Sequence, residues 1–174
     1  VMDKDGLAAF EKRIRARFEA AAAEPSGYPY RRWSEVLRAI YCAERDTAAY
    51  VALAEKTGLT PEDCLVLAKL QIARRRPGEA LVWVARGRAL DREGQIRSTA
   101  AYDLDQMHRE LLNKLGRGTE ALAAAWTDFR EHPGKYTYDD LMKFVPASER
   151  SAWHEKAMEA AKGADLRSVI ELSL

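Results

Sequence analysis

The stretch Cys64–Arg92 decides the fold, and it reads CLVLAKLQIARRRPGEALVWVARGRALDR. Strong helix formers dominate its first half, which predicts an α-helix. Pro77-Gly78 interrupts this helix, and Glu79-Ala80-Leu81 opens a second one. The stretch therefore predicts two antiparallel helices joined by a short turn.

A second stretch repeats this organisation further along the chain. Asp105–Pro133 reads DQMHRELLNKLGRGTEALAAAWTDFREHP, with Gly116 at the turn and Glu120-Ala121-Leu122 opening the second helix. A helical hairpin cannot bury its apolar face alone, so repeated hairpins indicate a stack.

Both stretches resemble the tetratricopeptide repeat. In that family the second helix opens with an alanine packed against the first helix, and Ala80 and Ala121 stand at this position. Ala68 and Gly87 match the other small positions in the first stretch. The resemblance implies an α-solenoid in which small residues let neighbouring helices approach closely.

The chain also departs from the tetratricopeptide pattern. Ala80 and Ala121 lie 41 residues apart, whereas the standard period is about 34 residues. The second stretch has Arg109 and Asp128 where the family has small residues. A third, degenerate copy is predicted over Tyr41–Thr57. The chain is therefore described as tetratricopeptide-like.

Clear start and stop signals divide the rest of the chain into helices. Thr60-Pro61-Glu62-Asp63 combines a capping residue, a first-turn proline and two acids. Asp46 is predicted to cap the preceding helix, and Gly58 to end it. Similar signals predict about nine or ten helices, the last beginning near Asp165.

The predicted fold is all-α, with stacked antiparallel hairpins forming a single domain over residues 1–174. Val1 precedes Met2, which suggests that the sequence is a fragment of a longer chain.

The whole chain is also similar to a bacterial all-helical family that has no assigned activity. This family is associated with the C-terminal regions of SWIM-type zinc-finger proteins. The similarity rests on Arg32-Trp33, Ala48–Leu53, Gly118–Leu122 and Trp153–Ala157. The Cys/His pattern that binds zinc in SWIM proteins is absent here, so the resemblance implies no metal role.

Composition argues against several classes of function. Lys and Arg total 28 and Asp and Glu total 27, which gives no general attraction to nucleic acid or anionic membranes. No apolar stretch approaches the length of a membrane span. Cys42 and Cys64 form no CxxC pair, so they are predicted to be reduced and buried, consistent with a cytoplasmic protein.

No motif indicates catalysis, a metal or a cofactor. His108, His132 and His154 lie far apart in the sequence, whereas a zinc site needs converging ligands. Carboxylate pairs such as Asp139-Asp140 stand in first helical turns, where acids favour the helix dipole. No nucleophile, phosphate-loop or dinucleotide motif is present. The sequence therefore predicts a protein that is not an enzyme.

The predicted function is a protein–protein interaction scaffold. In hairpin stacks the first helix of each hairpin lines the concave side. A peptide or partner helix would bind there through apolar anchors and flanking charges. The predicted contact residues are Leu65, Lys69, Ile72, Asp103, Gln106, Glu110, Asn113 and Lys114.

Two alternatives remain open at this stage. The chain could instead be a structural spacer or an oligomerisation module that forms homo-oligomers. The run Arg74-Arg75-Arg76 could also contact nucleic acid, with affinity that falls steeply as salt rises.

Overall fold

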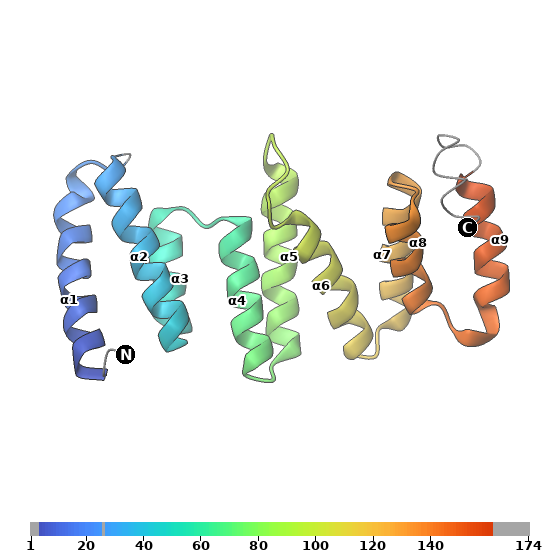
Figure 1. The fold of residues 1–174 in the computed structure, drawn as a ribbon, viewed down its shortest axis with the longest axis horizontal. Helices are drawn as coiled ribbons and strands as arrows, with labels where there is room; N and C mark the ends of the chain where they lie inside the picture. The colour runs from blue at the N-terminus through green and yellow to red at the C-terminus, as the bar shows by residue number, and fades with distance from the viewer. Residues whose placement is uncertain (1–3, 26, 162–174) are drawn as a thin grey trace. The chain divides into compact units, whose positions relative to one another are not determined.

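The computed structural model describes residues 4–25 and 27–161 (Figure 1). These residues form nine α-helices and two short 3-10 turns and contain no β-strand, which confirms the all-α prediction. The helix predicted near Asp165 lies outside the described residues. The elements are α1 (Lys4–Ala20), η1 (Ala21–Ala23), α2 (Tyr28–Glu44), α3 (Thr47–Thr57), α4 (Pro61–Ala73), α5 (Pro77–Glu93), α6 (Ala101–Lys114), α7 (Gly118–Glu131), α8 (Lys135–Phe144), η2 (Ala147–Glu149) and α9 (Arg150–Ala161).

The chain divides into two compact units, and the boundary falls inside α6. Unit 1 is Val1–Tyr102 and unit 2 is Asp103–Leu174. A single curved stack over residues 1–174 therefore stays a prediction.

The start of α4 has the capping chemistry that the sequence indicates. The Thr60 hydroxyl accepts a hydrogen bond from the Asp63 backbone N–H at 3.1 Å, and Asp63 Oδ2 accepts one from the Thr60 backbone N–H at 3.1 Å. This reciprocal capping box satisfies two backbone donors that the helix itself leaves unpaired. Asp46 caps α3 in a simpler way, because its Oδ1 accepts from the Ala49 N–H at 3.0 Å.

Three of the helix–helix turns share one backbone conformation. Arg45, Arg75 and Gly116 each adopt a left-handed conformation, with φ of 57°, 59° and 77°. Each donates its N–H to the carbonyl three residues before it, at 3.1, 2.9 and 3.0 Å. The following residue donates to the carbonyl five residues before it, at 2.9, 3.0 and 2.9 Å. These bonds are those of the Schellman motif, so the turn at Arg45, within Tyr41–Thr57, has the same backbone hydrogen bonds as the turns of the two repeated stretches.

The turn between α4 and α5 gives a first prediction. A left-handed conformation is strained for Arg75 but not for glycine. Arg75→Gly is therefore expected to raise the free energy of unfolding by about 0.5–1 kcal/mol, measured by urea denaturation. Gly116→Arg is the matched control and should lower it by about 1 kcal/mol. A loss of stability in Arg75→Gly would contradict the claim that the Arg75 backbone is strained.

The connection between α5 and α6 explains the unusual repeat spacing. Gly94–Ala100 projects beyond the end of α5 (Figure 1). Its base is held by the Ser98 N–H, which donates to Asp91 Oδ1 at 2.6 Å, and by the Thr99 hydroxyl, which donates to Glu62 Oε1 at 3.0 Å. The spacing of 41 residues between the two repeat alanines exceeds the period of about 34 residues by roughly the length of this loop.

The core of unit 1 joins α1 to α4. Ile14 and Phe18 of α1 and Leu37 of α2 are buried together with Leu53 of α3, and the same cluster reaches α4. Tyr30 stacks on Phe18 with ring centroids 4.7 Å apart. Tyr30 therefore packs the start of α2 on α1.

The described core of unit 2 lies between α7, α8 and α9. Phe129, Leu141 and Ala157 are fully buried in it. Trp126 and Trp153 pack against this core and meet edge to face, with centroids 5.5 Å apart. Both tryptophans therefore contribute to the packing of unit 2.

Candidate functional site

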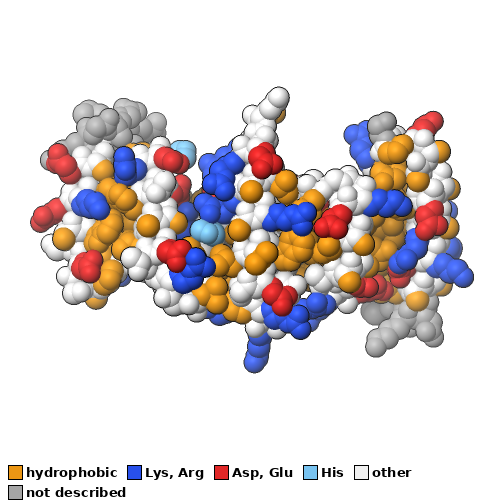
Figure 2. Space-filling view, turned by 180° about the vertical axis from the view of Figure 1, so that it is seen from behind, with side chains coloured by type: hydrophobic (Ala, Val, Ile, Leu, Met, Phe, Trp, Pro, Cys, Tyr) orange, Lys and Arg blue, Asp and Glu red, His pale blue; other side chains and the backbone are white. Residues whose placement is uncertain are grey.

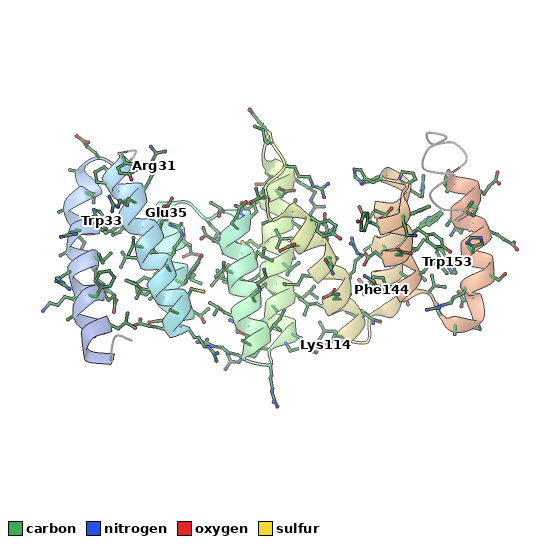
Figure 3. The ribbon with its side chains drawn as sticks, viewed as in Figure 1. Arg31, Trp33, Glu35, Lys114, Phe144 and Trp153 are labelled. Atoms are coloured by element: carbon green, nitrogen blue, oxygen red, sulfur yellow. The ribbon has the colours of Figure 1, made fainter. Side chains whose placement is uncertain are left out.

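The predicted contact residues of unit 1 lie on α4. Leu65 and Ile72 are half-buried, and Lys69 is exposed. The predicted residues of unit 2 lie on α6, where Asp103, Glu110, Asn113 and Lys114 are exposed and Gln106 is half-buried. Figure 3 shows Lys114 at the end of α6.

Within α6, Gln106 Nε2 donates to Glu110 Oε1 at 2.9 Å. The two predicted sets belong to different units, so the continuous groove over both stays a prediction.

Unit 1 contains an open cleft where α2, α3 and α4 meet. Its volume is about 530 Å³. Figure 3 shows Arg31 and Glu35, which line the cleft, on α2. The lining residues are Pro25, Tyr30, Arg31, Ser34, Glu35, Arg38, Tyr50, Thr57, Gly58, Thr60, Glu62, Asp63 and Val66.

A buried hydrogen-bond network connects the three helices behind this cleft. Asp63 Oδ1 accepts from Arg38 Nε at 2.7 Å and from the Tyr50 hydroxyl at 2.9 Å. Asp63 Oδ2 accepts from Arg38 Nη2 at 3.2 Å, and the same nitrogen donates to Thr57 Oγ1 at 2.7 Å. The carboxylate of the α4 capping box therefore also fixes α2 and α3.

The network perturbs the acidity of its two acids in opposite directions. Burial by itself would raise the pKa of Asp63, but the hydrogen bonds and positive charge of Arg38 outweigh burial and hold this pKa below its ordinary value. Burial, together with the neighbouring Asp63 carboxylate, raises the pKa of Tyr50 well above its ordinary value. Asp63 is thus stabilised as an anion, and Tyr50 as a neutral hydrogen-bond donor.

The rim of the cleft differs in charge from its floor, which the paired side chains of Arg38 and Asp63 form. Arg31, Glu35 and Glu62 are exposed and carry charges of both signs. The face seen in Figure 2 likewise has acidic and basic side chains interspersed over the helices. A ligand in the cleft would therefore meet a neutralised floor and a charged rim.

The predicted contact residues of α4, Leu65, Lys69 and Ile72, do not line this cleft, and Arg31 and Glu35 of α2 were not predicted to line a site. Their spacing indicates only that both lie on one face of the helix, because residues four apart do so.

A second charged cluster lies in unit 2, where the sequence departs from the tetratricopeptide pattern. The Arg109 side chain is only 4% exposed. Its Nη1 lies 3.3 Å from Asp128 Oδ2, and its Nε lies 2.7 Å from Asp140 Oδ2. The second of these contacts is a close ion pair without hydrogen-bond geometry, since neither atom has a hydrogen-bond partner. Arg109 thus connects α6 to α7 and α8.

The described part of the chain offers little for metal or thiol chemistry. Within residues 4–25 and 27–161, no three His, Cys, Asp or Glu side chains are grouped so that they could hold a metal ion. Cys64 is buried and Cys42 half-buried, and both are free thiols. Burial raises the pKa of Cys64 to about 11, so this thiol is protonated at neutral pH.

Comparison with known proteins adds no assignment. No protein-family model, curated protein or solved structure matches the chain. Among the described helices, none combines the length and the apolar character needed to cross a membrane.

Proposed function

We propose that the chain is a non-catalytic interaction scaffold that binds a peptide or partner helix, and that the cleft of unit 1 is a binding site. One observation carries this proposal: an open cleft of about 530 Å³ lies where α2 and α4, the first helices of two successive hairpins, meet. First helices are the ones that line the binding face in hairpin stacks.

The chemistry of the cleft suits a peptide. Arg31 and Glu35 on α2 and Glu62 on α4 offer charges of both signs, which can select the register of a bound segment. Val66 is half-buried and offers apolar contact. The rim side chains are exposed, and Glu62 also accepts a hydrogen bond from Thr99, while the floor keeps the helices in place.

The floor supports a binding role better than a catalytic one. A general base or acid works best with a pKa near the operating pH. Here the pKa of Asp63 is lowered and that of Tyr50 is raised, so both move away from neutrality. The hydrogen bonds of both groups are used to fix helices to one another.

This proposal gives a second prediction. Peptides selected from a random displayed library against the wild-type chain are expected to lose about tenfold or more in affinity for a Glu35→Lys/Glu62→Lys variant, because two rim charges are reversed. Fluorescence anisotropy with the selected, labelled peptides measures this loss.

Two further variants make the experiment specific. Glu44→Lys/Glu93→Lys reverses two exposed acids of unit 1 that do not line the cleft and should bind as the wild type does. Asp103→Lys/Glu110→Lys tests the predicted positions on α6 separately. The cleft is not the site if selected peptides bind its variant unchanged, and the scaffold proposal fails if the library yields no binder.

A further inference from the structure

The turns that follow α2 and α4 carry a cluster of arginines, which we call the turn edge: Arg45, Arg74, Arg75 and Arg76. All four residues are exposed. The Arg74 guanidinium donates through Nη2 to the Arg45 backbone carbonyl, so the two turns are adjacent. The turn edge therefore concentrates guanidinium groups from two hairpins.

Two of these arginines occupy positions where arginine is unfavourable. Arg45 and Arg75 both have the left-handed conformation, and the equivalent turn in the stretch Asp105–Pro133 has Gly116. The turn itself favours glycine, because glycine adopts positive φ without steric cost. The backbone conformation therefore gives no reason for arginine at either position. What arginine adds there, compared with glycine, is an exposed guanidinium group.

The positive charges at these two positions are not neutralised within the described part of the chain. Arg76 lies 3.5 Å from Glu79, and the Asp46 carboxylate caps α3. Arg45 and Arg75 make no ion pair with a described residue. Their guanidinium groups are thus available to an external anion.

We propose that the turn edge binds an acidic peptide segment of a partner protein. A guanidinium presents paired N–H donors that match the two oxygens of a carboxylate. Successive Asp or Glu side chains could therefore engage guanidinium groups from both turns at once. This surface lies beyond the C-terminal ends of α2 and α4, whereas the residues of these helices that line the cleft extend no further than Arg38 and Val66.

Single-stranded nucleic acid fits this surface less well. Proteins that bind single strands combine basic grooves with exposed aromatic rings on which the bases stack. The large exposed aromatic side chains described in unit 1 are Tyr28 and Tyr102, in the first turns of α2 and α6. Neither belongs to the turn edge, so the observations favour carboxylates over bases.

The test uses the 174-residue chain and a short fluorescein-labelled peptide that alternates Glu and Ser. A matched peptide has Gln at each Glu. The wild type is expected to bind the Glu peptide and not the Gln peptide in fluorescence anisotropy. Arg45→Gly/Arg75→Gly should weaken this binding about tenfold, because two charge-assisted contacts are lost.

The same double variant should unfold at a higher temperature, because glycine relieves both strained turns. Loss of binding in a more stable protein cannot result from unfolding. Arg13→Gln/Arg92→Gln removes two exposed arginines from helices elsewhere in unit 1 and should bind as the wild type does.

Three results would overturn the proposal. In the first, the glycine variant keeps its affinity or the arginine control loses it equally. In the second, the wild type does not distinguish the Glu from the Gln peptide. In the third, a short single-stranded RNA binds the turn edge more tightly than the Glu peptide does, and nucleic acid is then the better partner.

Discussion

Replacing Arg38 by methionine is expected to lower the free energy of unfolding at neutral pH by about 4 kcal/mol, because removing one partner of a buried ion pair leaves an uncompensated charge. The Asp63 side chain is 5% exposed and that of Arg38 is 18% exposed. Without Arg38, the carboxylate would keep its hydrogen bonds from Tyr50 and Thr60 but lose its cation. Urea denaturation followed by circular dichroism measures the change.

The pH dependence separates an electrostatic cause from lost packing. In the wild type the pKa of Asp63 is lowered on folding, so its contribution is present above the unfolded pKa of about 4 and is lost as pH falls through the folded value. In Arg38→Met, the hydrogen bonds and charge of Arg38 no longer oppose burial, so the folded pKa of Asp63 is expected to rise, while Tyr50 and Thr60 still donate to the carboxylate. The free energy of unfolding of Arg38→Met should therefore lie furthest below that of the wild type near neutral pH. This difference should shrink as the pH falls to about 4.

The double variant Arg38→Met/Asp63→Asn is the matched control. With no buried charge left, its stability deficit should be smaller than that of Arg38→Met and should lack the strong pH dependence. An equal deficit for Arg38→Met at neutral and acidic pH would mean that the guanidinium acts through packing alone.

The local features of the fold follow from the sequence because they depend on neighbouring residues. Thr60 and Asp63 are three positions apart, so their capping box is visible as a motif. The left-handed turn at Arg75 is different. Local preference argues against arginine there, and the conformation is recognised only when the turn is compared with that at Gly116.

The cleft and its network depend on contacts that the sequence does not display. Arg38 and Asp63 are 25 positions apart, and no local pattern pairs them. Tyr30 at the start of α2 packs on α1. The sequence does not show that Arg31, one residue later, faces the cleft, because that depends on where α4 lies.

Arg109 and Asp128 show how two departures from a repeat pattern can share one cause. Each replaces a small residue of the tetratricopeptide pattern, and each taken alone suggests a degenerate repeat. In the structure they form an ion pair. Opposite charges that depart together in one repeat are a signal that sequence analysis could use.

This ion pair leads to the last prediction. Arg109→Met is expected to lower the free energy of unfolding by about 3 kcal/mol, because the half-buried carboxylates of Asp128 and Asp140 then lose the buried cation that they share. The fluorescence of Trp126 and Trp153, which pack on the same core, should report the transition in urea.

Neutralising all three groups shows whether the loss of stability comes from unpaired charge or from altered packing. Arg109→Met/Asp128→Asn/Asp140→Asn leaves no buried ion, so it should recover most of the loss caused by Arg109→Met. Lys143→Ala removes only the exposed partner of Asp140 and should cost less than about 1 kcal/mol. If Arg109→Met costs no more than Lys143→Ala, Arg109 does not hold α6 against α7 and α8. In that case the two departures reflect a loosely packed repeat.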